Sequence, residues 1–348
     1  MKSKLMIKSR KFYAIILAVL AAVFYAAGIP ISKIILKDSD PTMTAAFLYL
    51  GAGAGIGLVY LFCRGAEEKA EPEKFDMSDL PYLAGMIILD ILAPIFLMNG
   101  IVRTAAANVS LLNNFEIVAT SLIAYFVFKE EISVRMWVSL LMVTASSMIL
   151  SFEGAGAFSF SHGSLFVLAA SVCWGFENNC TRMISSKSTY QIVILKGLCS
   201  GSGSLIIALM IGEHFPGIAA IAETMALGFV AYGMSIFAYI RAQRVIGAAK
   251  TSAFYALAPF IGAFLSFILL HEGLSCQYGI ALMIMIAGSL LAAADTLTYR
   301  HYHMHSHTVY HLNHGTLRRE TVVHEHEHSH TGPGLTHHHV HTAVKEDK

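Results

Sequence analysis

Two carboxylates, Glu116 and Asp90, interrupt long apolar stretches of this 348-residue sequence. Glu116 follows Asn113 by three residues and precedes Thr120 by four, and on a helix these spacings place the three side chains on one face. Ionisable groups are costly in lipid, so we expect this polar face to line a cavity, where Glu116 binds a cationic substrate or exchanges a proton. Asp90 precedes Pro94 by four residues and either caps a broken helix or faces the same cavity.

Structural interpretations compete with these chemical ones. Glu116 could instead join helices by accepting a hydrogen bond from Asn113 or Asn114. The polar run Glu177–Asn179 is predicted to be a helix end or an interfacial gate. Lys196 stands early in its apolar stretch, and we expect its long side chain to reach the cytoplasmic interface.

Histidine dominates the end of the chain, where 14 of the 17 histidines lie between His301 and His341. Imidazole binds zinc, nickel and cobalt, and a flexible chain can fold several imidazoles around one ion. The tail, residues 299–348, has too few apolar residues to form a core and is predicted to be disordered. Two alternatives are a polycation that gains charge on mild acidification and a segment without a role. The predicted metal ligands are His301, His303, His305, His307, His324, His326, His328, His330, His337, His338, His339 and His341.

The composition places these residues in a membrane protein. Hydrophobic residues make up 55% of the chain and charged residues 14%, whereas soluble domains carry about 25% charged residues. A soluble enzyme is therefore excluded, and no nucleophile elbow, HExxH or Walker motif indicates an enzyme or a required cofactor. The net charge of +1 gives no argument for nucleic-acid binding, and the five cysteines lack the CxxC spacing of a zinc knuckle.

About 20 apolar residues are needed to cross a bilayer, and the chain offers ten such windows. We expect all ten to be helices, because a backbone in lipid must satisfy its own hydrogen bonds. The even-numbered loops are rich in Lys and Arg, whereas the odd-numbered loops hold only Lys37 and Arg103, with Lys33 near a helix end. Both termini are therefore predicted to be cytoplasmic, in a multi-pass protein of the inner or plasma membrane. The windows are 12–36, 42–63, 80–99, 105–128, 134–152, 163–181, 190–211, 221–241, 248–270 and 277–294.

The chain also repeats itself. Residues 105–133 align without a gap on residues 247–275 at an offset of 142, which pairs Glu130 with Glu272. At an offset of 149, Tyr25 pairs with Trp174. The chain thus consists of two related halves of five helices, and because five is odd the second half enters the membrane from the opposite side. Such an inverted repeat is typical of transporters that work by alternating access.

The sequence resembles the EamA-type drug/metabolite transporter superfamily in its two halves, in the Ala-rich entry into the fourth and ninth spans, in Pro259 of the sequence APF, and in the closing acids Glu130 and Glu272. The resemblance covers about residues 12–295. It implies an all-α fold of ten helices, with repeats at 12–152 and 163–295, that carries a small metabolite, amino acid or drug-like amine, with proton coupling as an option. Glu130 and Glu272 are expected to be structural.

One residue departs from the family pattern. Where the fourth span of such proteins often has a proline, this chain has Ile117, so a proline kink is expected only in the ninth helix. The resemblance also places aromatic residues on spans that line the cavity. The aromatic candidates for substrate binding are Tyr25, Trp174, Tyr232, Tyr239 and Tyr255.

Small residues in the second and seventh spans predict close helix packing. Gly51, Gly53, Gly55 and Gly57 form overlapping GxxxG patterns, and the repeat-matched run Ser200–Ser204 is equally small. Two rival functions remain: a divalent-metal transporter fed by the tail, and a membrane metal sensor that transports nothing. Against the first, the spans lack clusters of His and Asp.

Overall fold

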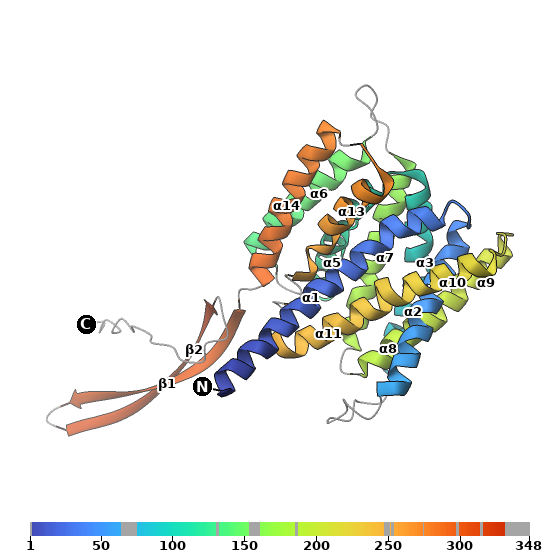
Figure 1. Cartoon of the computed structure of the whole chain (residues 1–348). Helices are drawn as coiled ribbons and strands as arrows, with labels where there is room; N and C mark the ends of the chain where they lie inside the picture. The colour runs from blue at the N-terminus through green and yellow to red at the C-terminus, as the bar shows by residue number, and fades with distance from the viewer. Residues whose placement is uncertain are drawn as a thin grey trace. The chain divides into compact units, whose positions relative to one another are not determined.

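The computed structural model describes residues 2–63, 75–129, 132–152, 161–184, 187–246, 251, 254–273, 275–296, 299–313 and 316–330. The chain divides into two compact units, Met1–Ala293 and Ala294–Lys348. The first unit is built of helices, which Figure 1 shows packed side by side. In chain order they are α1 (Lys2–Ile35), α2 (Pro41–Cys63), α3 (Leu80–Arg103), α4 (Ala106–Leu112), α5 (Phe115–Phe126), α6 (Val134–Ser151), α7 (His162–Met183), α8 (Thr189–Leu195), the π-helix η1 (Lys196–Ser200), α9 (Gly201–Met210), α10 (Ile218–Gly228), the π-helix η2 (Phe229–Met234), α11 (Ser235–Ile246), α13 (Ala258–Leu270) and α14 (Cys276–Thr296).

The prediction of an all-helical, multi-pass membrane protein is confirmed. Among the described residues, eight helical spans are long and apolar enough to cross a membrane. The other two predicted windows coincide with α7 and α13. Helix α7 has 22 residues but carries Glu177 and Arg182, which lower its hydropathy, and α13 has only 13 residues.

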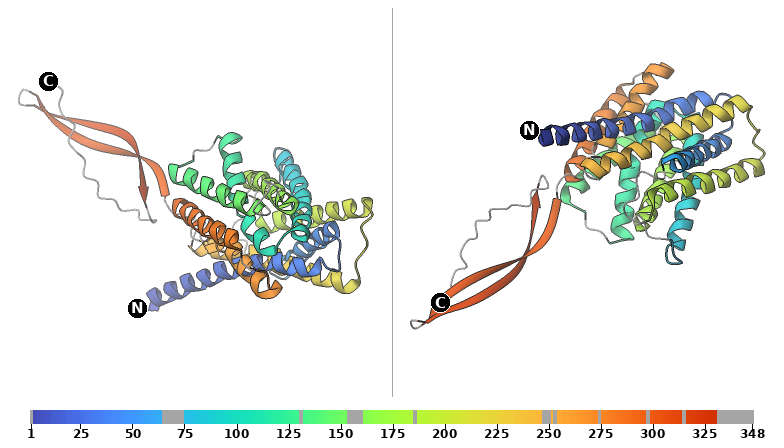
Figure 2. Two further views of the ribbon diagram at one scale, coloured as in Figure 1. Left: turned by 90° about the horizontal axis from the view of Figure 1, so that it is seen from above. Right: turned by 60° about the horizontal axis from the view of Figure 1, so that its bottom comes forward.

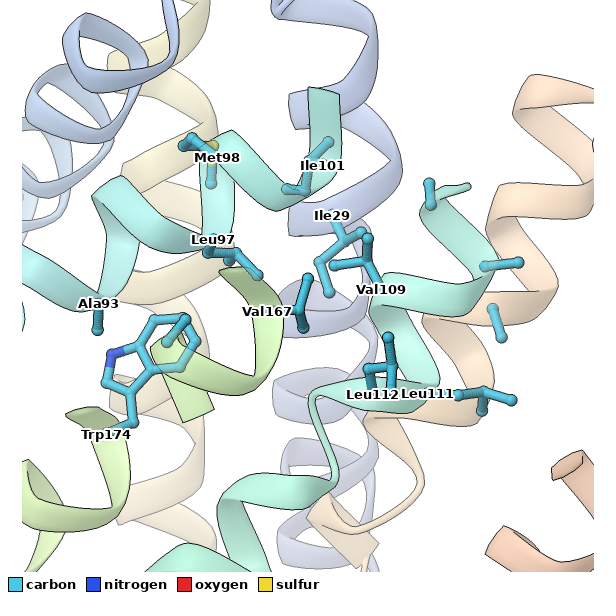
Figure 3. Close-up of a cluster of buried hydrophobic side chains, with 14 of the residues drawn as sticks. Ile29, Ala93, Leu97, Met98, Ile101, Val109, Leu111, Leu112, Val167 and Trp174 are labelled. Carbon is cyan, nitrogen blue, oxygen red and sulfur yellow. The ribbon is translucent and has the colours of Figure 1, made fainter. Parts of the chain in front are cut away.

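Contacts between the halves hold the helices together. Helix α3 packs on α7, and α1 lies beside α11, as Figure 2 also shows. Figure 3 shows Val167 and Trp174 of α7 next to Ala93 and Leu97 of α3, with Ile29 of α1 close by. All five side chains are buried, so the apolar core is shared by both halves.

Glycines let α2 approach the segment formed by η1 and α9, as predicted. A Cβ atom on Gly197 would lie 2.4 Å from the Cα atom of Gly53, and one on Gly201 would lie 2.7 Å from the backbone nitrogen of Leu50. Only glycine allows backbones to approach this closely. We call this contact, formed by Gly53, Gly197 and Gly201, the glycine contact.

Helices α6 and α14, the fifth and tenth spans, are joined by two hydrogen bonds that α6 donates to α14. Ser139 donates its hydroxyl to the carbonyl of Gly288 at 2.8 Å, and Ser146 donates to that of Ala281 at 2.6 Å. At the offset of 142, Ala281 is the counterpart of Ser139 and Gly288 that of Ser146. The residue number rises along one helix as it falls along the other. The two helices are therefore antiparallel, and the contact uses the same two positions of each repeat, crosswise, with α6 as the donor in both bonds.

The fourth and ninth spans are both broken, at matched positions. The fourth turns at Asn113–Asn114, between α4 and α5, and the ninth at Ala256–Leu257, just before α13. The sequence predicts a proline kink only in the ninth span, and the fourth span is broken as well, without a proline. The backbone N–H of Asn114 donates to Leu111 and that of Ile117 donates to Asn114, which are three-residue bonds of a tightened turn. Asparagine side chains compete with helical backbone bonds, so a break here needs no proline.

The described part of the tail consists of two antiparallel strands, β1 (Tyr299–Asn313) and β2 (Thr316–His330). Their register pairs His301 with His328 and His305 with His324. Because a lone two-stranded hairpin is marginally stable at best in water, the disordered tail remains a prediction. Four of the predicted metal ligands, His337, His338, His339 and His341, lie outside the described residues.

Candidate functional site

A cavity of about 300 Å³ lies where the two helix breaks meet the middle of the bundle. Its wall is formed by residues of α1, α2, α5, α7, α8, η1, η2, α11 and α13 and by both breaks. The fourth span contributes Asn113, Asn114 and Glu116, and the matched segment of the ninth contributes Tyr255 and Ala258. The polar break of the fourth span and the matched break of the ninth span therefore face the same cavity.

Glu116 lines this cavity from the first turn of α5, as the sequence predicted. Its Oε1 accepts a hydrogen bond from Nδ2 of Asn178 at 2.6 Å, and the same nitrogen lies 3.4 Å from the hydroxyl of Thr120. The side-chain partner is thus Asn178 rather than Asn113 or Asn114. Thr120 lies at the edge of the site, and among the described residues it is not part of the cavity wall.

The two asparagines of the break carry polar atoms without partners. Asn113 donates through Nδ2 to the hydroxyl of Tyr25 at 3.1 Å. Within the part of the chain that the structure describes, Asn113 Oδ1 and Asn114 Nδ2 are buried and have no hydrogen-bond partner. Buried polar atoms are nearly always hydrogen-bonded, so an acceptor and a donor left over on a cavity wall are suited to a polar ligand.

Lys196 forms ion pairs with two buried carboxylates. Its Nζ lies 3.1 Å from Oδ2 of Asp90 and 2.9 Å from Oε1 of Glu177. Asp90 also accepts a hydrogen bond from the hydroxyl of Tyr49 at 3.2 Å, and Glu177 accepts one from Thr181. We call Asp90, Lys196 and Glu177 the charged triad.

The charged triad corrects three expectations. Lys196 lines the cavity and pairs with Glu177, so the prediction of an interfacial lysine is wrong. Helix α7 continues to Met183, so the prediction of a helix end at 177–179 is wrong as well. Asp90 does not cap a broken helix, because α3 runs unbroken from Leu80 to Arg103. Sequence alone missed the triad because its members come from α3, α7 and η1, and no local spacing connects them.

Aromatic side chains form the rest of the wall. Four of the five predicted aromatic residues line the cavity: Tyr25, Trp174, Tyr232 and Tyr255. The ring of Tyr25 lies 5.8 Å from that of Tyr232 and 5.4 Å from that of Tyr255, measured between centroids. Tyr239 lies behind Tyr255, at 5.2 Å, outside the described cavity wall.

Tyr49 belongs to this wall but was not predicted. Its hydroxyl accepts a hydrogen bond from the indole nitrogen of Trp174 at 3.3 Å. Its position two residues before Gly51, where α2 meets the second half, is the one local signal that could have indicated it.

The closing acid of the second half caps a helix of the first half. Glu272 accepts hydrogen bonds from the backbone nitrogens of Ala106 at 2.7 Å and Ala107 at 2.9 Å, at the start of α4. The predicted structural role of Glu272 is thus supported by these contacts, whereas Glu130 lies outside the described residues. Glu213 caps α2 in the same way, accepting from Thr42 and Met43.

No metal centre is found in the described ranges, where no three His, Cys, Asp or Glu residues group in a way that could hold an ion. Binding of zinc, nickel or cobalt by the tail therefore remains a prediction.

Comparisons with known proteins agree with this architecture. The EamA-like transporter family matches residues 12–152 and again residues 161–294. An uncharacterised transporter of Methanothermobacter thermautotrophicus is 24% identical over 80% of this chain and 85% of its own length. The uncharacterised transporter YyaM of Bacillus subtilis is 23% identical over 71% of this chain and 82% of its own.

One solved structure supports the fold alone. A crystal structure whose description names no function aligns with a TM-score of 0.58 at 16% identity, over 80% of this chain and 95% of that one. Two family matches that together span most of the sequence decide the assignment. The chain is a multi-pass membrane protein that belongs to the EamA-like transporter family and carries two EamA domains.

Proposed function

We propose that this transporter carries a small metabolite bearing an amino group, by alternating access, with Glu116 as the group that binds the ammonium. The observation that carries the proposal is the cavity at the break of the fourth span. There a carboxylate stands beside an unpartnered acceptor on Asn113 and an unpartnered donor on Asn114. A volume of about 300 Å³ lies at the lower end of ligand pockets, which run from about 300 to 1,000 Å³, so the ligand is small.

The aromatic wall suits a positively charged ligand as well. Tyrosine and tryptophan faces attract cations, and Tyr25, Tyr232 and Trp174 surround the same space. Glu116 can release the bound ammonium by taking up a proton, which would couple export of the amine to proton entry. This coupling is the finer part of the proposal.

Alternating access is supported by the geometry of the halves. The antiparallel contact of α6 with α14 uses the same two positions of each repeat, crosswise, as expected for halves inserted with opposite orientation. The cavity lies between these halves, where rocking would open it to one side at a time.

Contacts at the ends of the bundle support the predicted orientation. Glu213 and Glu272 lie in predicted outer loops, and they cap α2 and α4 of the first half. At the predicted cytoplasmic end, Lys187 pairs with Asp79 at 3.0 Å. Basic loops and both chain termini then share the cytoplasmic side.

Transport in proteoliposomes tests the proposal. Purified protein is reconstituted with a panel of labelled amines, amino acids and Zn²⁺, with and without an imposed proton gradient, using intact chain and chain ended after Asp295. Uptake of an amino compound that responds to the gradient and is unaffected by truncation supports the proposal. Uptake of Zn²⁺ alone would establish the metal transporter instead, and no flux of any compound would favour a sensor.

A further inference from the structure

The charges around the cavity are unequal. The described wall carries one basic side chain, Lys196, together with the carboxylates of Glu116 and Glu177. Asp90 is not part of this wall but forms an ion pair with Lys196. The ammonium of Lys196 donates a hydrogen bond to Oε1 of Glu177 and forms an ion pair with Oδ2 of Asp90 at 3.1 Å. Lys196 is therefore already neutralised, and the carboxylates outnumber it.

We propose that the charged triad makes the cavity selective for amines that lack a carboxylate, so that amino acids are rejected. The inference deepens the proposed function and depends on it. A substrate carboxylate would need a free cation on the wall, and Lys196 is occupied. It would also lie close to Glu177 and Glu116, and like charges placed together are a common way to exclude a wrong partner.

The geometry of the triad keeps Lys196 in this role. Tyr49 donates to Asp90, Trp174 donates to Tyr49, and Thr181 donates to Glu177. These bonds hold both carboxylates in place against Lys196. The ammonium is thus kept away from ligands by the protein's own acids, and Glu116 remains the acid that is free of a basic partner among the contacts described.

The test compares three probes that differ in one group. Tyramine is an amine, tyrosine adds a carboxylate to the same skeleton, and tyrosine methyl ester keeps the added bulk but removes the negative charge. Binding to the full chain in detergent is measured by competition with labelled tyramine. We expect the ester to bind within a few-fold of tyramine and tyrosine to bind about 100-fold more weakly, since like-charge contacts cost several kcal/mol and each tenfold is 1.4 kcal/mol.

A variant then tests whether the triad sets the preference. Asp90→Asn combined with Glu177→Gln removes both partners of Lys196 while keeping side-chain shape, and tyrosine binding should rise at least about tenfold. Adding Lys196→Met to this double variant should abolish the gain. Glu223→Gln, at an exposed position of α10, is the matched control for loss of one carboxylate and should leave the preference unchanged.

The outcomes separate the two proposals. If the unmodified protein binds tyrosine as well as tyramine, the selectivity is refuted while transport of amino compounds stands. If the ester is excluded as strongly as tyrosine, size decides and the triad does not. If none of the three probes binds or is transported, both proposals fall. Should the double variant not fold, the comparison of the three probes on the unmodified protein decides alone.

Discussion

The two helix breaks occupy equivalent places in the repeats but carry different chemistry. At the offset of 142, Asn113 corresponds to Tyr255 and Glu116 to Ala258. The first break supplies a carboxylate and two asparagines to the cavity, whereas the second supplies a phenol ring and apolar side chains. Both breaks nevertheless interrupt the helix within one residue of the same register.

This difference shows that backbone and chemistry are specified separately. In the second half Pro259, in the first turn of α13, lacks a backbone donor, and in the first half two asparagines form a turn without proline. The shared backbone preserves the shape of a central cavity. The unshared side chains give that cavity one acidic side and one aromatic side.

Removing the acid of the first break should have the largest effect. Glu116→Gln keeps the shape and an acceptor for Asn178 but removes the negative charge. A hydrogen bond to a charged group is worth about 1.5–3 kcal/mol, so we expect amine transport to fall about 10- to 100-fold and to lose its response to a proton gradient. Uptake assays at equal protein per vesicle measure both.

The control for this variant is Glu223→Gln, which removes an exposed carboxylate of α10 that does not line the cavity and should transport normally. If Glu116→Gln transports like the unmodified protein at every pH, Glu116 has a structural role. The chemical difference between the two breaks then does not contribute to transport. Transport would then have to be explained by other residues of the wall.

The glycine contact, by comparison, is a place where both halves need the same small residue. In Gly53→Ala the new Cβ would lie 2.7 Å from the backbone nitrogen of Leu198, so the helices must separate. Such overpacking typically costs about 1–3 kcal/mol, and we expect a lower melting temperature in detergent together with weaker transport. Thermal unfolding monitored by fluorescence measures the first effect.

A matched glycine on the same helix provides the control. A Cβ on Gly57 would meet nothing within 4 Å, so Gly57→Ala should be neutral or stabilising by about 0.5 kcal/mol, because alanine restricts the unfolded chain. Equal destabilisation by both substitutions would contradict the close contact at Gly53.

The sequence predicted the elements well because hydrophobicity is a local property. Apolar runs near 20 residues long located the spans, and the offset of 142 located the repeat. Glu116 was found because one carboxylate in an apolar run stands out. The apolar runs and the lone carboxylate each lie within one stretch of chain, and the repeat requires only the alignment of two stretches.

The missing parts of the site depend on contacts between distant stretches. Lys196 stands near one end of its window, where reaching the membrane surface is the usual role of a lysine. Only the packing of α3 and α7 beside η1 brings Asp90 and Glu177 to it. The break at Asn113 has a different origin: the fourth span has no proline there, and two asparagines form the turn instead.

A smaller effect is expected from the acid that closes the second half. Glu272→Ala leaves the backbone nitrogens of Ala106 and Ala107 without their acceptor, and loss of a helix cap costs about 0.5–2 kcal/mol. We expect a modest drop in melting temperature and an unchanged order of substrate preference. The melting temperature of Glu272→Gln, which keeps one acceptor oxygen, should lie between those of Glu272→Ala and the unmodified protein. A changed substrate preference in either variant would mean that the cap shapes the cavity.

The smallest effect on transport is expected from the tail, which has no counterpart in the first half. Ending the chain after Asp295 removes residues beyond both family matches, so transport of an amine should be unchanged. The same truncation should abolish high-capacity zinc or nickel binding, because 14 histidines at four per site could hold about three ions. Calorimetry on intact and truncated protein measures the difference.

The pH dependence of that binding identifies the ligands. Imidazole must be neutral to bind a metal and takes up a proton near pH 6.5, so binding should weaken steeply between about pH 7.5 and 5.5. Affinity that is unchanged at the lower pH would rule out histidine ligation. If truncation instead stops transport of an amine in buffer treated with a chelator, the tail takes part in transport itself, and the two breaks would not be the whole of the transport mechanism.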